Sequence, residues 1–217
     1  MAEGRELILR RTARFFKDGQ LVNLGIGLPS EIPQYIGQDV DIVLQSENGA
    51  LGLGPAPPTG EEDKDVTNAG GLPATVYPGG MCFDSCYSFS LIRGGHVDVT
   101  VLGALEVDQE GNLANYMIPN KLTPGMGGAM DLVVGAKTVI VAMDHCDKYG
   151  NPKILKKCTL PLTAAKQVNY IVTEAGVFGI TDGGLLLLEV APGESPESIA
   201  QKTDAVFTVS PNLKQMA

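Results

Sequence analysis

Hydrophobic residues recur at helical spacing near the start of the chain. Within residues 5 to 18 they gather on one side: Ile8, Leu9, Thr12, Ala13, Phe15 and Phe16. A one-sided apolar stripe is typical of a helix that packs on a core. Gly19 follows as a natural C-terminal stop. The pattern therefore predicts a first helix that ends before Gly19.

Short apolar runs bounded by glycine, proline and polar residues predict buried strands further along. Leu21 to Leu24 and Ile42 to Leu44 are the first two, and Ser30 can cap a short helix between them that reaches Ile36. The second strand ends at the polar turn Gln45-Ser46-Glu47-Asn48-Gly49. Open α/β sheets keep their ligands at the carboxyl ends of strands, so this turn is a candidate site.

Strands and helices continue to interleave over the rest of the chain. The pattern predicts a capped helix from Asp84 or Ser85 to Arg93 and Gly94, a half-buried strand through Val97, Val99 and Val101, a turn at 108–112, a glycine-rich helix start at 127–134, strands at 138–143, 168–173, 177–180 and 185–190, a hairpin turn at Asp182-Gly183-Gly184, and a last helix from Ser195-Pro196-Glu197. Interleaving indicates an α/β fold. The closely spaced last strands indicate an antiparallel portion near the C-terminus.

Length and composition favour a single domain. A chain of 217 residues with 44% hydrophobic residues suits one core, so we expect one domain over residues 1–217. The segment Gly54 to Val66 is rich in proline and acidic residues, which predicts a solvated surface loop. Whether this loop folds over the Glu47 turn as a lid is left open.

Charge and hydropathy narrow the class of partner. The chain has 25 acidic and 16 basic residues and a formal charge of -9, the wrong sign for binding phosphate backbones. It has no apolar run of about 18 residues or more, and its charged N-terminal stretch has no signal-peptide core. We therefore expect a cytoplasmic protein that binds neither nucleic acid nor membranes.

The cysteines and histidines do not form a recognisable site. Cys82, Cys86, Cys146 and His145 offer the ligand types that zinc favours, but the usual paired CxxC spacing is missing. Reduced, small buried thiols are the favoured interpretation, and we expect no metal. Neither His145 nor His96 lies in the context of a catalytic triad, so both are interpreted as structural.

Glu47 needs no histidine to react. A glutamate side chain has a reference pKa near ~4.3 and is ionised at neutral pH, so it can attack a thioester without a general base. Such a reaction needs donors for an oxyanion, and glycine-rich turns at strand ends can supply backbone amides. The composition, with 27 glycines and two histidines, suits this chemistry.

The sequence QSENGALGLGP around Glu47 resembles the signature of the nucleophilic glutamate in the family I CoA-transferases. The resemblance extends over nearly the whole chain in seven blocks, in the family's order: VNLGIGLP (22–29), LQSENG (44–49), NAGG (68–71), SFSLIRGGHVD (88–98), NLANYMIPNK (112–121), GMGGAMDL (125–132) and KKCTLPLT (156–163). It is most similar to the bacterial β subunits that act on acetate, butyrate and acetoacetate.

This resemblance implies a fold and a set of roles. The family fold is an open, mostly parallel α/β sheet flanked by helices. Glu47 corresponds to the nucleophile, which takes the acyl group as a mixed anhydride and then CoA as a glutamyl thioester. Asn23 corresponds to a side-chain amide near that glutamate, and Gly128 and Ala129 to backbone amides that hold the oxyanion and the end of the CoA thiol. Each has a structural alternative: Asn23 as a turn former, the glycines as sites of tight packing.

The resemblance also implies substrates and a partner. We expect CoA transfer between short-chain acyl-CoA and acetate, butyrate or acetoacetate, with no cofactor because CoA is itself a substrate. A 3-oxo dicarboxylate such as 3-oxoadipate, or succinate, is the alternative. Succinate-using animal relatives carry lysine after NAG where this chain has Gly71, which favours a monocarboxylate. The expected partner is an α subunit in an α2β2 assembly, whose basic surface would offset the charge of -9.

Two other classes of function fit the sequence less well. A dinucleotide-dependent oxidoreductase would use Gly25-x-Gly27 after the first strand, but Ser30 stands where the third glycine is required. A non-catalytic partner subunit would have no need of an ionised glutamate in an intact SENG turn. Both are weaker than the transferase interpretation.

Overall fold

A computed structural model describes residues 2–121 and 125–216. Its helices are α1 (Ala2–Ala13), the 3₁₀ helix η1 (Leu28–Tyr35), α2 (Ser85–Arg93), α3 (Ala129–Gly135) and α4 (Pro196–Gln201). Its strands are β1 (Leu21–Leu24), β2 (Val43–Ser46), β3 (Ala50–Leu53), β4 (Val76–Cys82), β5 (Val99–Leu102), β6 (Glu106–Asp108), β7 (Leu113–Ala114), β8 (Thr138–Ala142), β9 (Ile154–Leu155), β10 (Tyr170–Val172), β11 (Gly176–Thr181), β12 (Gly184–Val190) and β13 (Phe207–Gln215).

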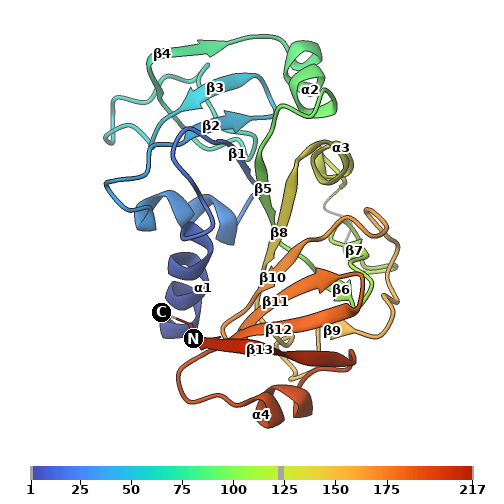
Figure 1. Ribbon diagram of the computed structural model, residues 1–217. Coiled ribbons are helices and arrows are strands. Elements are labelled where there is room, and N and C mark those ends of the chain that lie inside the picture. The colour runs from blue at the N-terminus through green and yellow to red at the C-terminus, as the bar shows by residue number, and fades with distance from the viewer. Residues whose placement is uncertain (1, 122–124, 217) are drawn as a thin grey trace.

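One large sheet runs through the molecule (Figure 1). Its ten strands lie in the order β13-β12-β11-β10-β8-β5-β1-β2-β3-β4. The five strands from β10 to β2 are parallel, whereas β2-β3-β4 and β10-β11-β12 pair antiparallel. A smaller sheet has the order β7-β6-β9. The predicted α/β class and the antiparallel portion near the C-terminus are confirmed.

Helices cover both faces of the large sheet, so its central strands are buried on both sides. Val22 of β1 packs with Ile8 and Leu9 of α1 in one core cluster. Leu21 packs against the other cluster, which includes residues of α2, α3 and α4. Since side chains alternate along a strand, Asn23 points to the same face as Leu21. Asn23 therefore lies beneath α2 and α3.

Several predicted elements are confirmed. β1 has the predicted bounds, and the Asp84 carboxylate caps α2 by accepting a hydrogen bond from the Tyr87 N–H (2.8 Å). At α4, the Ser195 hydroxyl accepts from the Ser198 N–H and the Ser198 hydroxyl accepts from the Ser195 N–H, which forms a capping box. These elements were predictable because their caps and apolar residues are close in sequence.

Several details of the prediction were wrong. The second strand is Val43–Ser46 rather than Ile42 to Leu44, so Gln45 and Ser46 belong to the strand and not to the turn. The first helix covers Ala2–Ala13 rather than residues 5 to 18, although Phe16 is still buried. The helix expected after Ser30 is a 3₁₀ helix that begins directly after Gly27 and contains Pro33, whose ring removes a backbone donor. The strand expected to be half-buried is buried along all of β5, because it lies between β1 and β8.

Candidate active site

Glu47 lies in the turn between β2 and β3, at the carboxyl end of β2 (Figure 1). The turn depends on Gly49, which has φ +126°, a conformation that side chains disfavour. A Cβ at this position would lie 2.0 Å from the Phe83 carbonyl oxygen. The glycine of the SENG motif is therefore required by the close approach of the chain before α2.

The two polar neighbours of Glu47 fasten a distant segment to this turn. The Ser46 hydroxyl accepts a hydrogen bond from the Ala69 N–H (3.0 Å), and the Asn48 side-chain amide donates to the Thr67 carbonyl (2.8 Å). The Asn68 side-chain oxygen in turn accepts hydrogen bonds from the backbone amides of Gly70 in the NAGG block and of Leu72 directly after it. The segment after the acidic loop is thus held beside Glu47. Residues 54–66 form an irregular loop, as predicted.

Gly128, which immediately precedes α3, contacts the Glu47 carboxylate directly. Its N–H donates to Glu47 Oε1 at 3.3 Å. A Cβ at Gly128 would lie 3.0 Å from Glu47 Cδ and 3.1 and 3.2 Å from the two carboxylate oxygens. Only a glycine lets the backbone amide approach the carboxylate this closely.

Asn23 completes the surroundings of Glu47 from the sheet. Its side chain is almost fully buried, and its Nδ2 donates to the carbonyl oxygen (3.2 Å) and the side-chain Oε1 (2.7 Å) of Gln45. Burial raises the pKa of the Glu47 carboxyl above its usual range, while the Gly128 N–H and the Asn23 side chain act in the opposite direction. The carboxylate is therefore poorly hydrated but faces two donors, which suits a nucleophile.

The structure brings together three of the four residues expected at the site: Glu47, Asn23 and Gly128. The fourth, Ala129, follows Gly128 at the start of α3, but its N–H donates to the Met126 carbonyl (3.2 Å). In this conformation, the Ala129 amide is engaged within its own turn.

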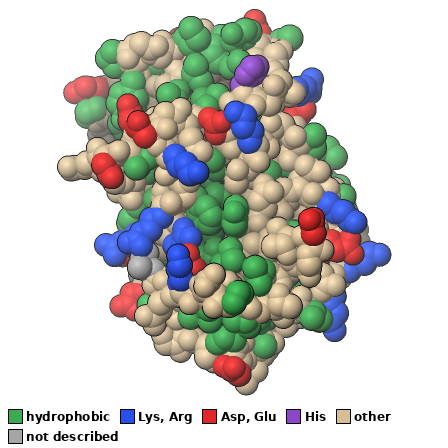
Figure 2. All heavy atoms as spheres, viewed as in Figure 1, with side chains coloured by type: hydrophobic (Ala, Val, Ile, Leu, Met, Phe, Trp, Pro, Cys, Tyr) green, Lys and Arg blue, Asp and Glu red, His purple; other side chains and the backbone are tan. Residues whose placement is uncertain are grey.

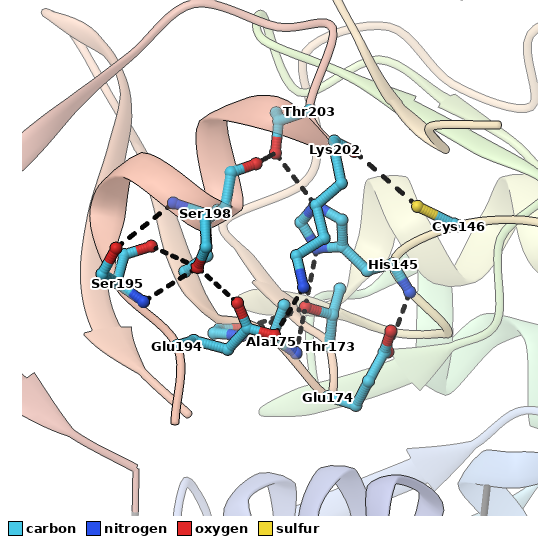
Figure 3. A network of polar contacts seen from close by, with 12 residues as sticks. His145, Cys146, Thr173, Glu174, Ala175, Glu194, Ser195, Ser198, Lys202 and Thr203 are labelled. Carbon is cyan, nitrogen blue, oxygen red and sulfur yellow. Dashed lines mark hydrogen bonds and ion pairs between the residues drawn. The ribbon is translucent and has the colours of Figure 1, made fainter. Parts of the chain in front are cut away.

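His145 and the four cysteines differ in burial. His145 is fully buried between α4 and β10, and its ring nitrogens bond the hydroxyls of Thr173 (3.0 Å) and Thr203 (2.9 Å) (Figure 3). All four cysteines are free thiols, but Cys82 in β4 and Cys86 in α2 are exposed, so the expectation of buried thiols was wrong for these two. Over residues 2–121 and 125–216, no three His, Cys, Asp or Glu side chains are grouped to hold a metal ion.

Two residues beside this site have contacts that the sequence did not predict: Gln45, which was placed in the polar turn but lies in β2, and Ser88. Both are buried, and Gln45 Nε2 donates to Ser88 Oγ at 2.8 Å. Gln45 precedes Glu47 by two positions, and alternation along a strand could have placed it beneath the turn. Ser88 had no such signal, because its contact joins residues 43 positions apart.

Comparison with known proteins identifies the family. A sequence model of the family described as coenzyme A transferase matches residues 5–202. The chain belongs to this family. It is 56% identical over 212 residues to the acetate CoA-transferase subunit beta of Haemophilus influenzae, covering 98% of this chain and 95% of that one. It is 51% identical over 211 residues to the subunit of the same name from Escherichia coli, covering 97% and 96%.

Two further matches are to longer chains. A mouse mitochondrial succinyl-CoA:3-ketoacid coenzyme A transferase 2A is 51% identical over 214 residues, and this chain spans 41% of its length. The solved acyl-CoA transferase YdiF of Escherichia coli O157:H7 superposes with a TM-score of 0.78 at 24% identity, over 99% of this chain and 43% of that one. At that identity the likeness is one of fold, and it confirms the open α/β sheet.

None of the helices in the described parts of the chain is long and apolar enough to cross a membrane.

Proposed function

We propose that this chain is the glutamate-bearing β subunit of a CoA-transferase that moves CoA between short-chain acyl-CoA and acetate, butyrate or acetoacetate, with Glu47 as the nucleophile. One observation carries the role of Glu47: its half-buried carboxylate lies at the carboxyl end of β2 and accepts a hydrogen bond from the Gly128 amide. A surface turn without chemistry has no need of a desolvated carboxylate beside a glycine amide.

In the first step, the Glu47 carboxylate attacks the thioester carbonyl of the acyl-CoA, and the CoA thiolate leaves. The thiolate then attacks the Glu47 carbonyl of this mixed anhydride, which releases the first carboxylate and leaves CoA on Glu47 as a thioester. The acceptor carboxylate reverses the sequence and leaves as a new acyl-CoA. Each attack creates an oxyanion, and the donors we assign to it are the Gly128 N–H, which bonds Glu47 Oε1, and the Asn23 amide.

A separate α subunit completes the site in this proposal. The relatives that match over nearly their full length carry names of separate beta subunits, and the family reaction uses two halves. Large apolar side chains are more than half exposed on segments around the Glu47 turn: Ile26, Leu72, Tyr77, Met81 and Tyr87. Figure 2 shows apolar side chains gathered at the end of the molecule that carries β4 and α2.

Charge supports the same partner. Both carboxylates and CoA are anions, and this chain also carries a negative formal charge of -9, so its net charge repels its substrates. Arg93, a candidate counter-charge, forms an ion pair with Asp131 (2.7 Å). A basic surface supplied by the α subunit would offset this repulsion. The proposed assembly is α2β2.

Reconstitution tests this proposal. The purified chain alone should lack transferase activity and bind CoA weakly by calorimetry, and addition of the cognate α subunit should restore both. Acetyl-CoA and butyryl-CoA should then be tested against acetate, butyrate, acetoacetate, succinate and 3-oxoadipate. Full activity of the isolated chain would contradict the two-subunit arrangement. A preference for succinate or 3-oxoadipate would contradict the substrate assignment.

A further inference from the structure

A row of buried polar side chains crosses the sheet beneath the Glu47 turn. Gln45 of β2, Asn23 of β1 and Thr100 of β5 occupy matching positions on three adjacent parallel strands. All three side chains are buried, at 3%, 1% and 0% exposure. Burial of polar groups in the middle of a sheet lowers stability unless hydrogen bonds satisfy them. The alignment of three such groups beneath the Glu47 turn therefore suggests a functional role.

The row continues into α2 through Ser88, and its hydrogen bonds have a fixed direction. The Ser88 hydroxyl donates to the Ser46 carbonyl (3.4 Å) and accepts from Gln45 Nε2 (2.8 Å), while Gln45 Oε1 accepts from Asn23 Nδ2 (2.7 Å). A backbone carbonyl can only accept. The Ser46 carbonyl therefore fixes the role of Ser88, which fixes the orientation of the Gln45 amide. The Gln45 side chain then fixes the orientation of Asn23 together with the Gln45 backbone carbonyl, which also accepts from Asn23 Nδ2 (3.2 Å).

This direction prevents the Asn23 amide from turning over. With the amide reversed, Asn23 Oδ1 would face Gln45 Oε1, and two acceptors would repel. In the observed orientation Nδ2 is the atom held toward the β2 side, where it also favours the ionised form of Glu47. Within the described residues, Asn23 Oδ1 and Thr100 Oγ1 are buried without a hydrogen-bond partner. The orientation is thus held from the Gln45 side alone.

We propose that Gln45 and Ser88 are positioning residues for the transferase reaction. They hold the Asn23 amide with Nδ2 on the side of β2, the strand that leads into Glu47, while the carboxylate becomes the anhydride and then the thioester. This inference rests on the proposed role of Glu47. In this assignment Gln45 and Ser88 contact neither substrate nor the Glu47 side chain, and their effect is expected to pass through Asn23. An effect that passed through the Ser46 carbonyl, which Ser88 also contacts, would persist in the Asn23→Ala background.

A double-mutant cycle in the reconstituted α and β complex tests this dependence. Gln45→Met keeps the length of the side chain but removes both of its hydrogen bonds. We expect kcat to fall by about 10-fold or more, with the KM for acyl-CoA nearly unchanged, as for loss of an interaction made in the transition state. In an Asn23→Ala background, Gln45→Met should cause no further loss. An equal loss in both backgrounds would overturn the proposal.

Ser88→Ala is the second variant, because it removes one hydroxyl and keeps the packing of α2. Its expected effect is a smaller fall in kcat that also disappears in the Asn23→Ala background. Ser90→Ala is the matched control: Ser90 lies on the same helix, and its hydroxyl donates to the Cys86 carbonyl (2.8 Å) at an exposed position. If Ser88→Ala and Ser90→Ala are equally active, the relay through Ser88 is wrong.

Mass spectrometry of the CoA adduct separates this inference from the proposed function. If Glu47 carries the adduct in every variant and the effects of Gln45 and Asn23 are additive, only the positioning role fails. If an active complex carries no adduct on Glu47, the proposed function fails first, and the positioning role fails with it.

Discussion

The surroundings of Glu47 and of His145 are both polar and largely buried, but they differ in how completely hydrogen bonds satisfy them. Both ring nitrogens of His145 have a threonine hydroxyl within 3.0 Å, and its backbone N–H donates to Glu174 (2.9 Å) (Figure 3). Among residues 2–121 and 125–216, the one hydrogen bond to the Glu47 carboxylate is that from Gly128 to Oε1, at 3.3 Å. The Asn23 and Thr100 oxygens beneath it have no partner within the described residues.

This difference separates a structural cluster from a reactive one. A satisfied network rigidifies its surroundings and leaves nothing for a ligand to bind. Near His145, α4 is fastened further by the ion pair of Lys202 with Glu194. Glu47 instead combines desolvation with donors that approach it loosely, as expected of a site whose bonds tighten in the transition state. Mutations in the two regions should therefore change different properties: activity at Glu47 and stability at His145.

The largest effect is expected at Glu47 itself. Glu47→Ala should abolish CoA transfer by the complex, because the covalent intermediate cannot form, while thermal unfolding of the chain changes little. Glu47→Gln is the matched control for shape, since its amide oxygen can still accept from Gly128. It should also be inactive. A Glu47→Gln complex with substantial activity would show that the carboxylate is not the nucleophile.

A side chain at Gly128 should be nearly as damaging. Gly128→Val would place its Cβ 3.0 Å from Glu47 Cδ and block approach of the substrate to the carboxylate. We expect a larger loss of kcat than for any change at Asn23. Gly183→Val is the control, because its Cβ would have only Thr181 Oγ1 nearby, at 3.6 Å in a distant hairpin. Equal activity of the two variants would show that Gly128 is not part of the active site.

Loss of the Asn23 amide should be intermediate. Asn23→Ala should lower kcat by about 10- to 1000-fold, the range for removal of a preorganised donor. Because Asn23 lowers the pKa of Glu47, its removal should move the acidic limb of the rate profile to higher pH. An unchanged rate and an unchanged profile would mean that Asn23 is only a strand residue.

His145 should affect stability and leave transfer unchanged. Burial lowers its pKa from 6.5 to about 4, so the unfolded chain takes up a proton at a higher pH than the folded chain. Stability is then fully present above pH 6.5 and is lost as the pH falls toward 4, by about 3 kcal/mol in total. Urea unfolding at several pH values should show this loss in the wild type. The loss should be absent in His145→Gln, relative to that variant's own stability at neutral pH.

Much of this molecule could be predicted from local sequence, and the rest depends on contacts between distant segments. β1, α2, α4 and the Glu47 turn follow from apolar runs and caps within a few residues. β4 and β13 were missed, because most of their residues are exposed and show no alternation. β3 was missed because it is four residues long and is defined by pairing with β2 and β4.

The site shows the same division. Glu47 could be found from its turn. Asn23 and Gly128 were found through family resemblance, because they lie 24 and 81 positions from Glu47 in the sequence. The hydrogen bonds of Gln45 and Ser88 beneath the turn were found only in the structure. The single-domain organisation of residues 1–217, the closing of the 54–66 loop as a lid and the cytoplasmic location stay predictions.

The central claim is that Glu47 carries CoA covalently during the reaction, and mass spectrometry of the enzyme tests it most directly. The complex is incubated with acetyl-CoA without acceptor, quenched and digested, and the peptide that contains Glu47 is analysed with and without hydroxylamine. A CoA-sized adduct on Glu47 that hydroxylamine removes is the expected result. An adduct on a cysteine, or no adduct in a complex that turns over, would contradict the account.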